Sequence, residues 1–235
     1  VVDECGECGG DGSEICWDGS YECDASDCPT VTVEIPIFPG WNWISINVVA
    51  DDMSINNVLA SLNSTVNDFI KSPNGASIYY GEESGWQGAL FELAATQMYM
   101  LLSAYTDMLV FTGIPVAPLE TPIFLQEGWN WISYTPQNAC PINEALSSIT
   151  ATQNDFIKSQ TASSIYYGEE LGWQGSLSIM FPGGSYMLKV ASASTLIYPE
   201  DCSLVRVQEK NELPSSISSW AVNPHSYEFS GTIDM

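Results

Sequence analysis

Two pairs of neighbouring glutamates are the first side chains in this sequence that resemble parts of an active site. Glu82-Glu83 and Glu169-Glu170 each supply the two carboxylates that glycoside hydrolysis requires. Neighbouring side chains on a strand or turn point apart, however, and the pair occurs twice where one active site needs it once. We therefore predict that both pairs lie in solvated turns and are not catalytic.

Other catalytic chemistries are limited by composition. His225 is the single histidine of the 235 residues, which excludes a His-rich zinc site and disfavours Ser/His/Asp or Cys/His catalysis. The sequence has no glycine-rich phosphate loop, and its five lysines and arginines are too few and too scattered for phosphoryl transfer. We expect a protein that is not an enzyme and has no catalytic residues.

The charge balance excludes further partners. The chain has 29 acidic and 5 basic residues, a formal net charge of −24, yet 45% of its residues are hydrophobic, as in a folded protein. Nucleic acids and anionic membranes require clustered Lys and Arg, so neither is expected as the main partner. The longest apolar stretch, 98–119, is interrupted by Asp107, Gly113 and two prolines, so no membrane span is expected.

The cysteines indicate where the protein is located. Five of the seven cysteines fall within residues 1–29, which is typical of an oxidising compartment and predicts a secreted or cell-surface protein. The sequence begins without an initiator methionine or a basic leader region. We interpret it as a mature or internal fragment of a longer polypeptide.

The chain contains an internal duplication. The repeated blocks are PIF at 36–38 and 122–124, GWNWIS at 40–45 and 128–133, NDFIKS at 67–72 and 154–159, SIYYGEE at 77–83 and 164–170, and GWQG at 85–88 and 172–175. This pattern predicts two copies of one module, at 31–116 and 117–202. An acidic Cys-rich segment, 1–30, precedes them, and a linker with a C-terminal strand, 203–235, follows.

Each module is predicted to be mainly β with one short α-helix. Strands are expected at the GWNWIS, NDFIKS and SIYY blocks, from the third tryptophan onward, and near the end of each copy, at 98–104, 108–112, 186–191 and 195–198. Apolar residues at helical spacing follow Ser54 and Pro141, as Ile55, Val58, Leu59 and Leu62 in the first copy and Ile142, Ala145, Leu146 and Ile149 in the second. The fold class is therefore two tandem homologous β modules behind a Cys-rich segment.

The tryptophans allow two interpretations. The first interpretation is a glycan-binding platform, because indole rings stack on the apolar faces of sugars. The residues of this platform would be Trp41, Trp43, Trp86, Trp129, Trp131 and Trp173. The second interpretation, which we favour, is core packing, because strand alternation places Trp41 and Trp43 on one face and a large aromatic pair on one face more often belongs to the core.

Lys71 and Lys158 recur at equivalent places in the two copies and predict an internal ion pair, with Asp68, Asp155 or a glutamate of the GEE turn.

The segment 1–29 carries nine carboxylates and no cation. It is too small to bury a core, so disulfides, a hard cation or both must hold it. Oxygen ligands among glycines suit Ca²⁺, and the candidate ligands are Asp11, Asp18, Asp24 and Asp27. The alternatives are a solvated acidic linker or, at Cys5 and Cys8, zinc or redox chemistry.

The two cysteines outside this segment, Cys140 and Cys202, are predicted to form a disulfide in module 2, between the entry of the helix and the exit of the last strand.

The C-terminal residues 220–235 alternate as a strand does, but no partner strands follow them in this sequence. One interpretation is a donor strand that pairs with the open edge of a β module in another copy, giving head-to-tail self-association. The other is the opening strand of a further domain, because WAVNPHSYEFSG is similar to a WxVNPxxYExSM motif of marine surface proteins.

Two resemblances point the same way. The order GWN-x-IS, short helix, Tyr-rich strand, Gly-Trp and a Gly/Tyr-Met turn resembles the tandem GWNLIS…GYW modules of bacterial and archaeal secreted and surface proteins, over about 170 residues. The run DECGECGGDG is similar to DxCGxCGGD repeats, which look like thrombospondin type-3 calcium repeats. Both imply an extracellular module and leave its ligand open.

These observations support one leading function and one rival. The leading function is a non-enzymatic extracellular structural or adhesive protein, a segment of a cell-surface or filament-forming chain. The rival is a carbohydrate-binding accessory module of a secreted hydrolase. Exposed tryptophans would favour the rival, whereas buried tryptophans and intermolecular β contacts would favour the first.

Overall fold

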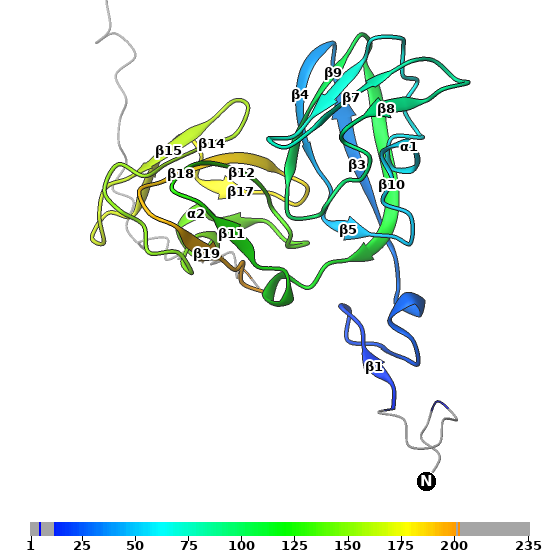
Figure 1. Cartoon of the computed structure of the whole chain (residues 1–235). Coiled ribbons are helices and arrows are strands. Elements are labelled where there is room, and N and C mark those ends of the chain that lie inside the picture. Colours follow the sequence, from blue (N-terminus) through cyan, green and yellow to red (C-terminus); the bar gives the residue numbers. More distant parts are fainter. Residues whose placement is uncertain (1–4, 6–11, 201, 203–235) are drawn as a thin grey trace, which may run out of the picture. The chain divides into compact units, whose positions relative to one another are not determined.

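The computed structural model describes Cys5, residues 12–200 and Cys202, which belong to one compact unit. The protein is mainly β, with antiparallel sheets and two one-turn helices in the described part (Figure 1). The predicted fold class is therefore confirmed.

Two disulfides hold the N-terminal segment together. Cys5 is bonded to Cys23 and Cys16 to Cys28. This segment contains β1 (Glu14–Ile15), β2 (Tyr21–Glu22) and the 3₁₀ helix η1 (Ala25–Asp27). These bridges replace the core that so short a segment cannot form.

Module 1 contains a five-stranded and a three-stranded sheet (Figure 1). The larger sheet has the order β4-β9-β6-β7-β8 and the smaller one β3-β10-β5. The elements are β3 (Val31–Ile37), β4 (Gly40–Ser45), β5 (Val48–Val49), α1 (Ile55–Val58), β6 (Phe69–Lys71), β7 (Ala76–Tyr79), β8 (Trp86–Gly88), β9 (Met98–Ser103) and β10 (Asp107–Pro115). A buried cluster that includes Ile44, Ile70 and Leu101 forms the core.

Module 2 repeats this plan with a core of its own. Its five-stranded sheet has the order β12-β18-β14-β15-β16, and shorter pairs join β11 to β19 and β13 to β17. The elements are η2 (Pro118–Glu120), β11 (Ile123–Leu125), β12 (Gly128–Ser133), β13 (Cys140–Pro141), α2 (Ile142–Ala145), β14 (Phe156–Lys158), β15 (Ser163–Tyr166), β16 (Trp173–Gly175), β17 (Ile179–Met180), β18 (Ser185–Val190) and β19 (Ser194–Leu196).

Cys140 and Cys202 form a disulfide with a Cα–Cα distance of 5.0 Å, so the predicted bridge is present. It joins the start of the helical turn to the chain just after β19. A separation of 62 residues makes it the longest covalent loop closure in the described structure. The bridge therefore restrains nearly three quarters of module 2.

The helices are shorter than the apolar spacing predicts. Ser54 caps α1, its hydroxyl accepting a hydrogen bond from Asn57 N–H at 3.4 Å, but the α-helix ends at Val58. Asn56 then bonds Trp86 at two points, with its side-chain oxygen accepting from Trp86 N–H at 2.8 Å and its amide donating to Trp86 C=O at 3.3 Å. These contacts between the Asn56 side chain and β8 hold the single helical turn against the sheet. Ile55, Val58 and Leu59 are buried there without a longer helix.

Candidate functional site

Trp41 and Trp43 lie on the outer face of the five-stranded sheet, so the expectation that they pack in the core is wrong. Alternation along β4 directs Asn42 and Ile44 inward instead. Asn42 tolerates burial because its amide donates to Phe38 C=O at 2.7 Å and its oxygen accepts from Phe38 N–H at 2.9 Å. The indole of Trp41 is 43% exposed and that of its counterpart Trp129 is 49% exposed.

The third tryptophan of each module does belong to the core. Trp86 and Trp173 are each only 4% exposed and lie beside Tyr79 and Tyr166, with ring centroids 5.5 Å apart in both modules. Of the six tryptophans considered for sugar binding, these two are therefore not available as a platform.

Lysines lie over the outward-facing tryptophans. Lys71 Nζ is 4.8 Å from the centroid of the Trp41 ring, and Lys158 Nζ is 5.3 Å from Trp129 and 5.7 Å from Trp43. Such distances allow cation–π attraction. Asp68 and Asp155, two of the carboxylates predicted to pair with these lysines, accept hydrogen bonds from backbone N–H groups, Asp68 from Thr65 and Ala104 and Asp155 from Thr152 and Ala191.

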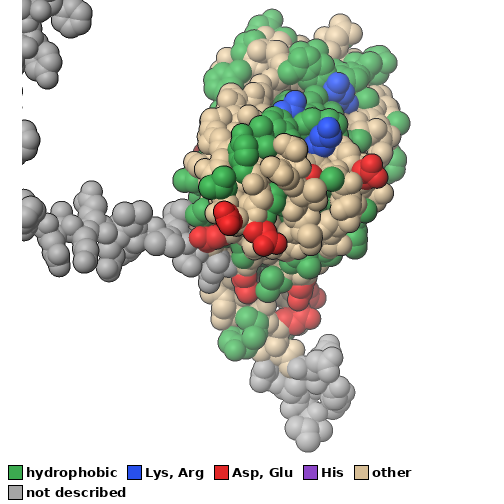
Figure 2. All heavy atoms as spheres, turned by 90° about the vertical axis from the view of Figure 1, so that its left-hand side faces the viewer, with side chains coloured by type: hydrophobic (Ala, Val, Ile, Leu, Met, Phe, Trp, Pro, Cys, Tyr) green, Lys and Arg blue, Asp and Glu red, His purple; other side chains and the backbone are tan. Residues whose placement is uncertain are grey.

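We call the outward-facing residues of the two larger sheets the aromatic–lysine faces; they comprise Trp41, Trp43, Phe69 and Lys71 in module 1 and Trp129, Trp131, Phe156 and Lys158 in module 2. In each module the first indole meets a phenyl ring edge-on, at 6.1 Å for Trp41–Phe69 and 5.9 Å for Trp129–Phe156. Figure 2 shows lysine side chains gathered among hydrophobic ones on one side of the molecule. Aromatic and cationic groups are thus concentrated in a protein that is otherwise strongly acidic.

The two modules contact each other through equivalent strand ends. The Ser45 hydroxyl, at the end of β4, donates to Gly184 C=O at 2.8 Å, and the Ser133 hydroxyl, at the end of β12, donates to Ala95 C=O. Gly184 lies in the turn that precedes β18 and Ala95 in the turn that precedes β9, the strands that pair with β12 and β4. The contact is therefore nearly symmetric, as expected for two copies of one fold.

Gln160 breaks this symmetry. Its side-chain oxygen accepts a hydrogen bond from Trp43 N–H at 2.9 Å, and its amide donates to Trp41 C=O at 2.7 Å. The free edge of β4 is thereby capped. At the equivalent turn of module 1, Pro73 stands in place of Gln160 and has no side-chain donor or acceptor. Gln160 is not among the residues predicted from the sequence, although it follows a repeated NDFIKS block at the position where the first copy has Pro73.

The predicted acidic sites are not assembled in the described residues. Glu82, Glu83, Glu169 and Glu170 are exposed in turns, as expected. The side chain of Asp18 accepts from the Ser20 hydroxyl at 2.7 Å and from Ser20 N–H at 3.0 Å, and that of Asp24 accepts from Ser26 N–H at 2.8 Å. These bonds lower the pKa of both carboxyls.

No group of three or more potential metal ligands occurs among the residues described here, and Asp27 joins no such group. Asp11 and Cys8 lie outside the described residues, as do His225 and the strand predicted at 220–235. Calcium binding by the N-terminal segment therefore remains a prediction.

Within the described residues, no helix is both long and apolar enough to span a membrane. Comparison of the chain with protein-family models, with curated proteins and with solved structures gives no match.

Proposed function

We propose that this chain is a non-enzymatic extracellular structural or adhesive protein, a segment of a cell-surface or filament-forming chain. Disulfides in both the N-terminal segment and module 2 support an oxidising, non-cytoplasmic location. The observation that carries the proposal is β3, a seven-residue strand at the edge of its sheet, paired among the described strands only with β10.

The backbone of β3 offers hydrogen-bonding groups on its free side. Val110, opposite Glu34 in the register, directs its N–H away from β3 to the Ser61 hydroxyl at 2.8 Å. The Glu34–Val110 pair is therefore not hydrogen-bonded, and Glu34 directs its own N–H and C=O outward. Open edges of this kind are templates for an additional strand.

In the proposed assembly, the segment 220–235 of one copy adds to β3 of the next. The alternating sequence of this segment suits a strand, and the repetition of one head-to-tail contact generates a filament unless the rotation closes a ring. Glu34 and Pro36 on the open edge limit unspecific pairing, a common protection of edge strands.

The test uses two substitutions at one position and light-scattering mass in solution. Glu34→Pro removes an outward N–H without removing a bond to β10, whereas Glu34→Ala keeps that N–H. We expect the parent and Glu34→Ala to form the same oligomers, and both Glu34→Pro and a chain lacking residues 215–235 to remain monomeric. A Glu34→Pro protein that assembles like the parent would contradict the proposed acceptor edge, and a parent that is monomeric at every concentration would contradict self-assembly.

A second candidate function is carbohydrate binding, as in an accessory module of a secreted hydrolase. The observation that favours it is the exposure of Trp41 and Trp129 on the aromatic–lysine faces. Indole faces at a protein surface are suited to stack on pyranose rings. Screening the full chain against an array of glycans tests this function, and a protein that binds none of them contradicts it.

A further inference from the structure

We infer that a hollow beside the free edge of β12 binds a neutral pyranose sugar through two backbone groups, Trp131 N–H and Trp129 C=O. The inference rests on the second proposed function, carbohydrate binding, and gives it a site and a ligand chemistry. It commits to module 2 alone, because the equivalent edge of module 1 is already occupied.

The register of β12 shows that these two backbone groups point away from its sheet. Ser133 N–H, at the end of β12, bonds Thr96 C=O of module 1 at 3.4 Å and not the neighbouring strand β18. Backbone groups of alternate residues on a strand face the same side, so Trp131 and Trp129 also direct theirs to the free edge. Neither group has a hydrogen-bond partner among the residues that the structure describes.

Module 1 shows what chemistry fits such an edge. There the primary amide of Gln160 places an acceptor 2.9 Å from Trp43 N–H and, next to it, a donor 2.7 Å from Trp41 C=O. The edge therefore recognises an adjacent acceptor and donor. Pro73, at the position equivalent to Gln160, supplies neither group to β12.

The space that Pro73 leaves is a hollow of about 360 Å³. Its lining includes Pro73, Asn74, Gln97, Phe124, Gln126 and Trp131. No side chain that lines the hollow is charged, although the chain carries a net charge of −24. The volume is within the range of small-ligand sites.

Three amide side chains, those of Asn74, Gln97 and Gln126, border the hollow and have no hydrogen-bond partner in the described part of the chain. The phenyl ring of Phe124 is 73% exposed beside them. Apolar rings together with a few polar groups are the usual composition of a small-molecule site. Here the polar groups are neutral and both donate and accept.

Vicinal hydroxyl groups of a pyranose reproduce the hydrogen bonding of the Gln160 amide. One hydroxyl oxygen accepts from Trp131 N–H, and the neighbouring hydroxyl donates to Trp129 C=O. The apolar face of the ring is then available for the indole and phenyl groups, and the remaining hydroxyls for the free amides. The uncharged lining favours a neutral sugar over an acidic one, because no side chain that lines the hollow carries a counter-charge for an ionised group.

An added peptide strand fits this edge less well than a sugar does. The hydrogen bond from Ser133 N–H to Thr96 C=O closes the edge immediately after Trp131. Only the backbone groups of Trp129 and Trp131 then remain for hydrogen bonds to an added strand. Strand addition draws its affinity from a row of such bonds. The longer free edge of β3 is the better acceptor for a strand.

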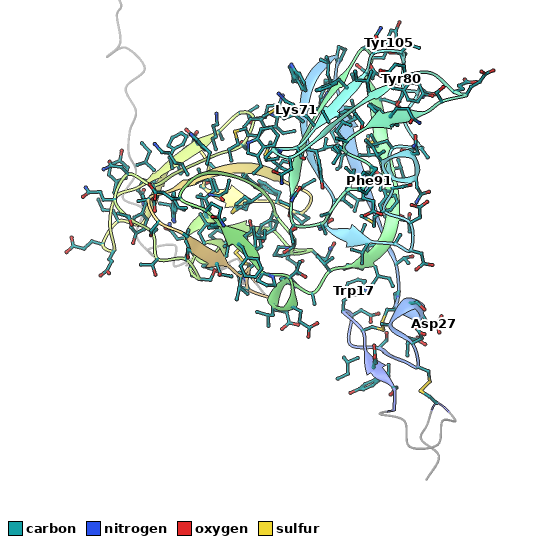
Figure 3. All side chains as sticks on the ribbon, viewed as in Figure 1. Trp17, Asp27, Lys71, Tyr80, Phe91 and Tyr105 are labelled. Carbon is teal, nitrogen blue, oxygen red and sulfur yellow. A yellow bond between two sulfur atoms is a disulfide. The ribbon has the colours of Figure 1, made fainter. Side chains whose placement is uncertain are left out.

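The inference is tested by moving the glutamine between the two modules. Pro73→Gln is designed to cap β12 as Gln160 caps β4, and Gln160→Ala to uncap β4. Tyr105→Ala, in a solvent-exposed turn of module 1 (Figure 3), is the control. Binding of neutral oligosaccharides, selected on the glycan array, is measured by isothermal titration calorimetry, and circular dichroism checks that each variant is folded.

We expect the parent to bind with one site, Tyr105→Ala to bind equally, Pro73→Gln to bind at least tenfold more weakly, and Gln160→Ala to gain a second site. A folded Pro73→Gln protein with unchanged sugar affinity overturns the inference while leaving carbohydrate binding as a function. A parent that binds no glycan overturns both. If a synthetic peptide of residues 220–235 binds the parent but not Pro73→Gln, the hollow is a peptide site and the sugar assignment is wrong.

Discussion

Removal of the disulfide between Cys140 and Cys202 is expected to destabilise module 2 strongly. The bridge closes a loop of 62 residues, and the chain-entropy model assigns about 4 kcal/mol of stability to a closure of this length. Cys140 is fully buried in the module core, so alanine is preferred to serine at both positions. Alanine avoids leaving a buried hydroxyl without a partner.

The measurement is urea unfolding of the Cys140→Ala/Cys202→Ala double variant, followed by tryptophan fluorescence. Buried Trp173 reports on module 2. With a slope of about 2 kcal/mol per molar urea, a loss of about 4 kcal/mol moves the midpoint of the module 2 transition down by roughly 2 M. The Cys5→Ala/Cys23→Ala variant is the matched control, because it opens a loop of 18 residues in the N-terminal segment.

The control variant is expected to leave the module 2 transition unchanged. A midpoint shift below about 0.5 M in the Cys140→Ala/Cys202→Ala variant would refute the reasoning. It would mean that loop closure contributes little and that the packing of the module suffices to hold its two ends together.

Three further predictions concern single residues. Asp155→Asn should lower the free energy of unfolding in urea by about 1–3 kcal/mol, because the Asp155 carboxylate accepts from two backbone N–H groups at 2.7 and 2.9 Å and only one end of an asparagine amide can accept. Asp52→Asn, at an exposed carboxylate, is the control, and an equal loss of stability in both variants would contradict this prediction. Gly175→Ala should destabilise module 2 severely, because the added Cβ would lie 2.2 Å from a backbone carbonyl oxygen, and a melting temperature equal to the parent's would contradict this. Burial raises the pKa of Tyr198 well above its ordinary value. The stability of the fold should therefore fall above about pH 10, where this tyrosine loses its proton in the unfolded chain but not in the folded one. Tyr198→Phe should show a smaller fall, and a stability profile at alkaline pH identical to the parent's would contradict this role of Tyr198.

The duplication determined much of this protein at the sequence level. Blocks that occur twice allow each prediction for one copy to be checked on the other, which is why the β class and the exposed glutamate turns followed from local pattern alone. The bridge between Cys140 and Cys202 also followed, because the module geometry brings the helix entry and the exit of the last strand together.

Which face of each larger sheet is buried was decided by the tertiary structure. Period-two alternation shows that Trp41 and Trp43 share a face, but it does not say which face is covered. Asn42 lies on the buried side, because its amide satisfies backbone groups of the adjoining turn. The indoles are therefore outside, where lysine ammonium groups lie over them.

The difference between the two strand edges also required the fold. Gln160 and Trp43 are 117 residues apart in sequence, and only the packing of one module against the other brings the glutamine amide to the β4 backbone. The sequence shows that Pro73 and Gln160 occupy equivalent turns. It does not show that each turn faces the edge strand of the opposite module, because long-range contacts between modules leave no periodic signal in either copy.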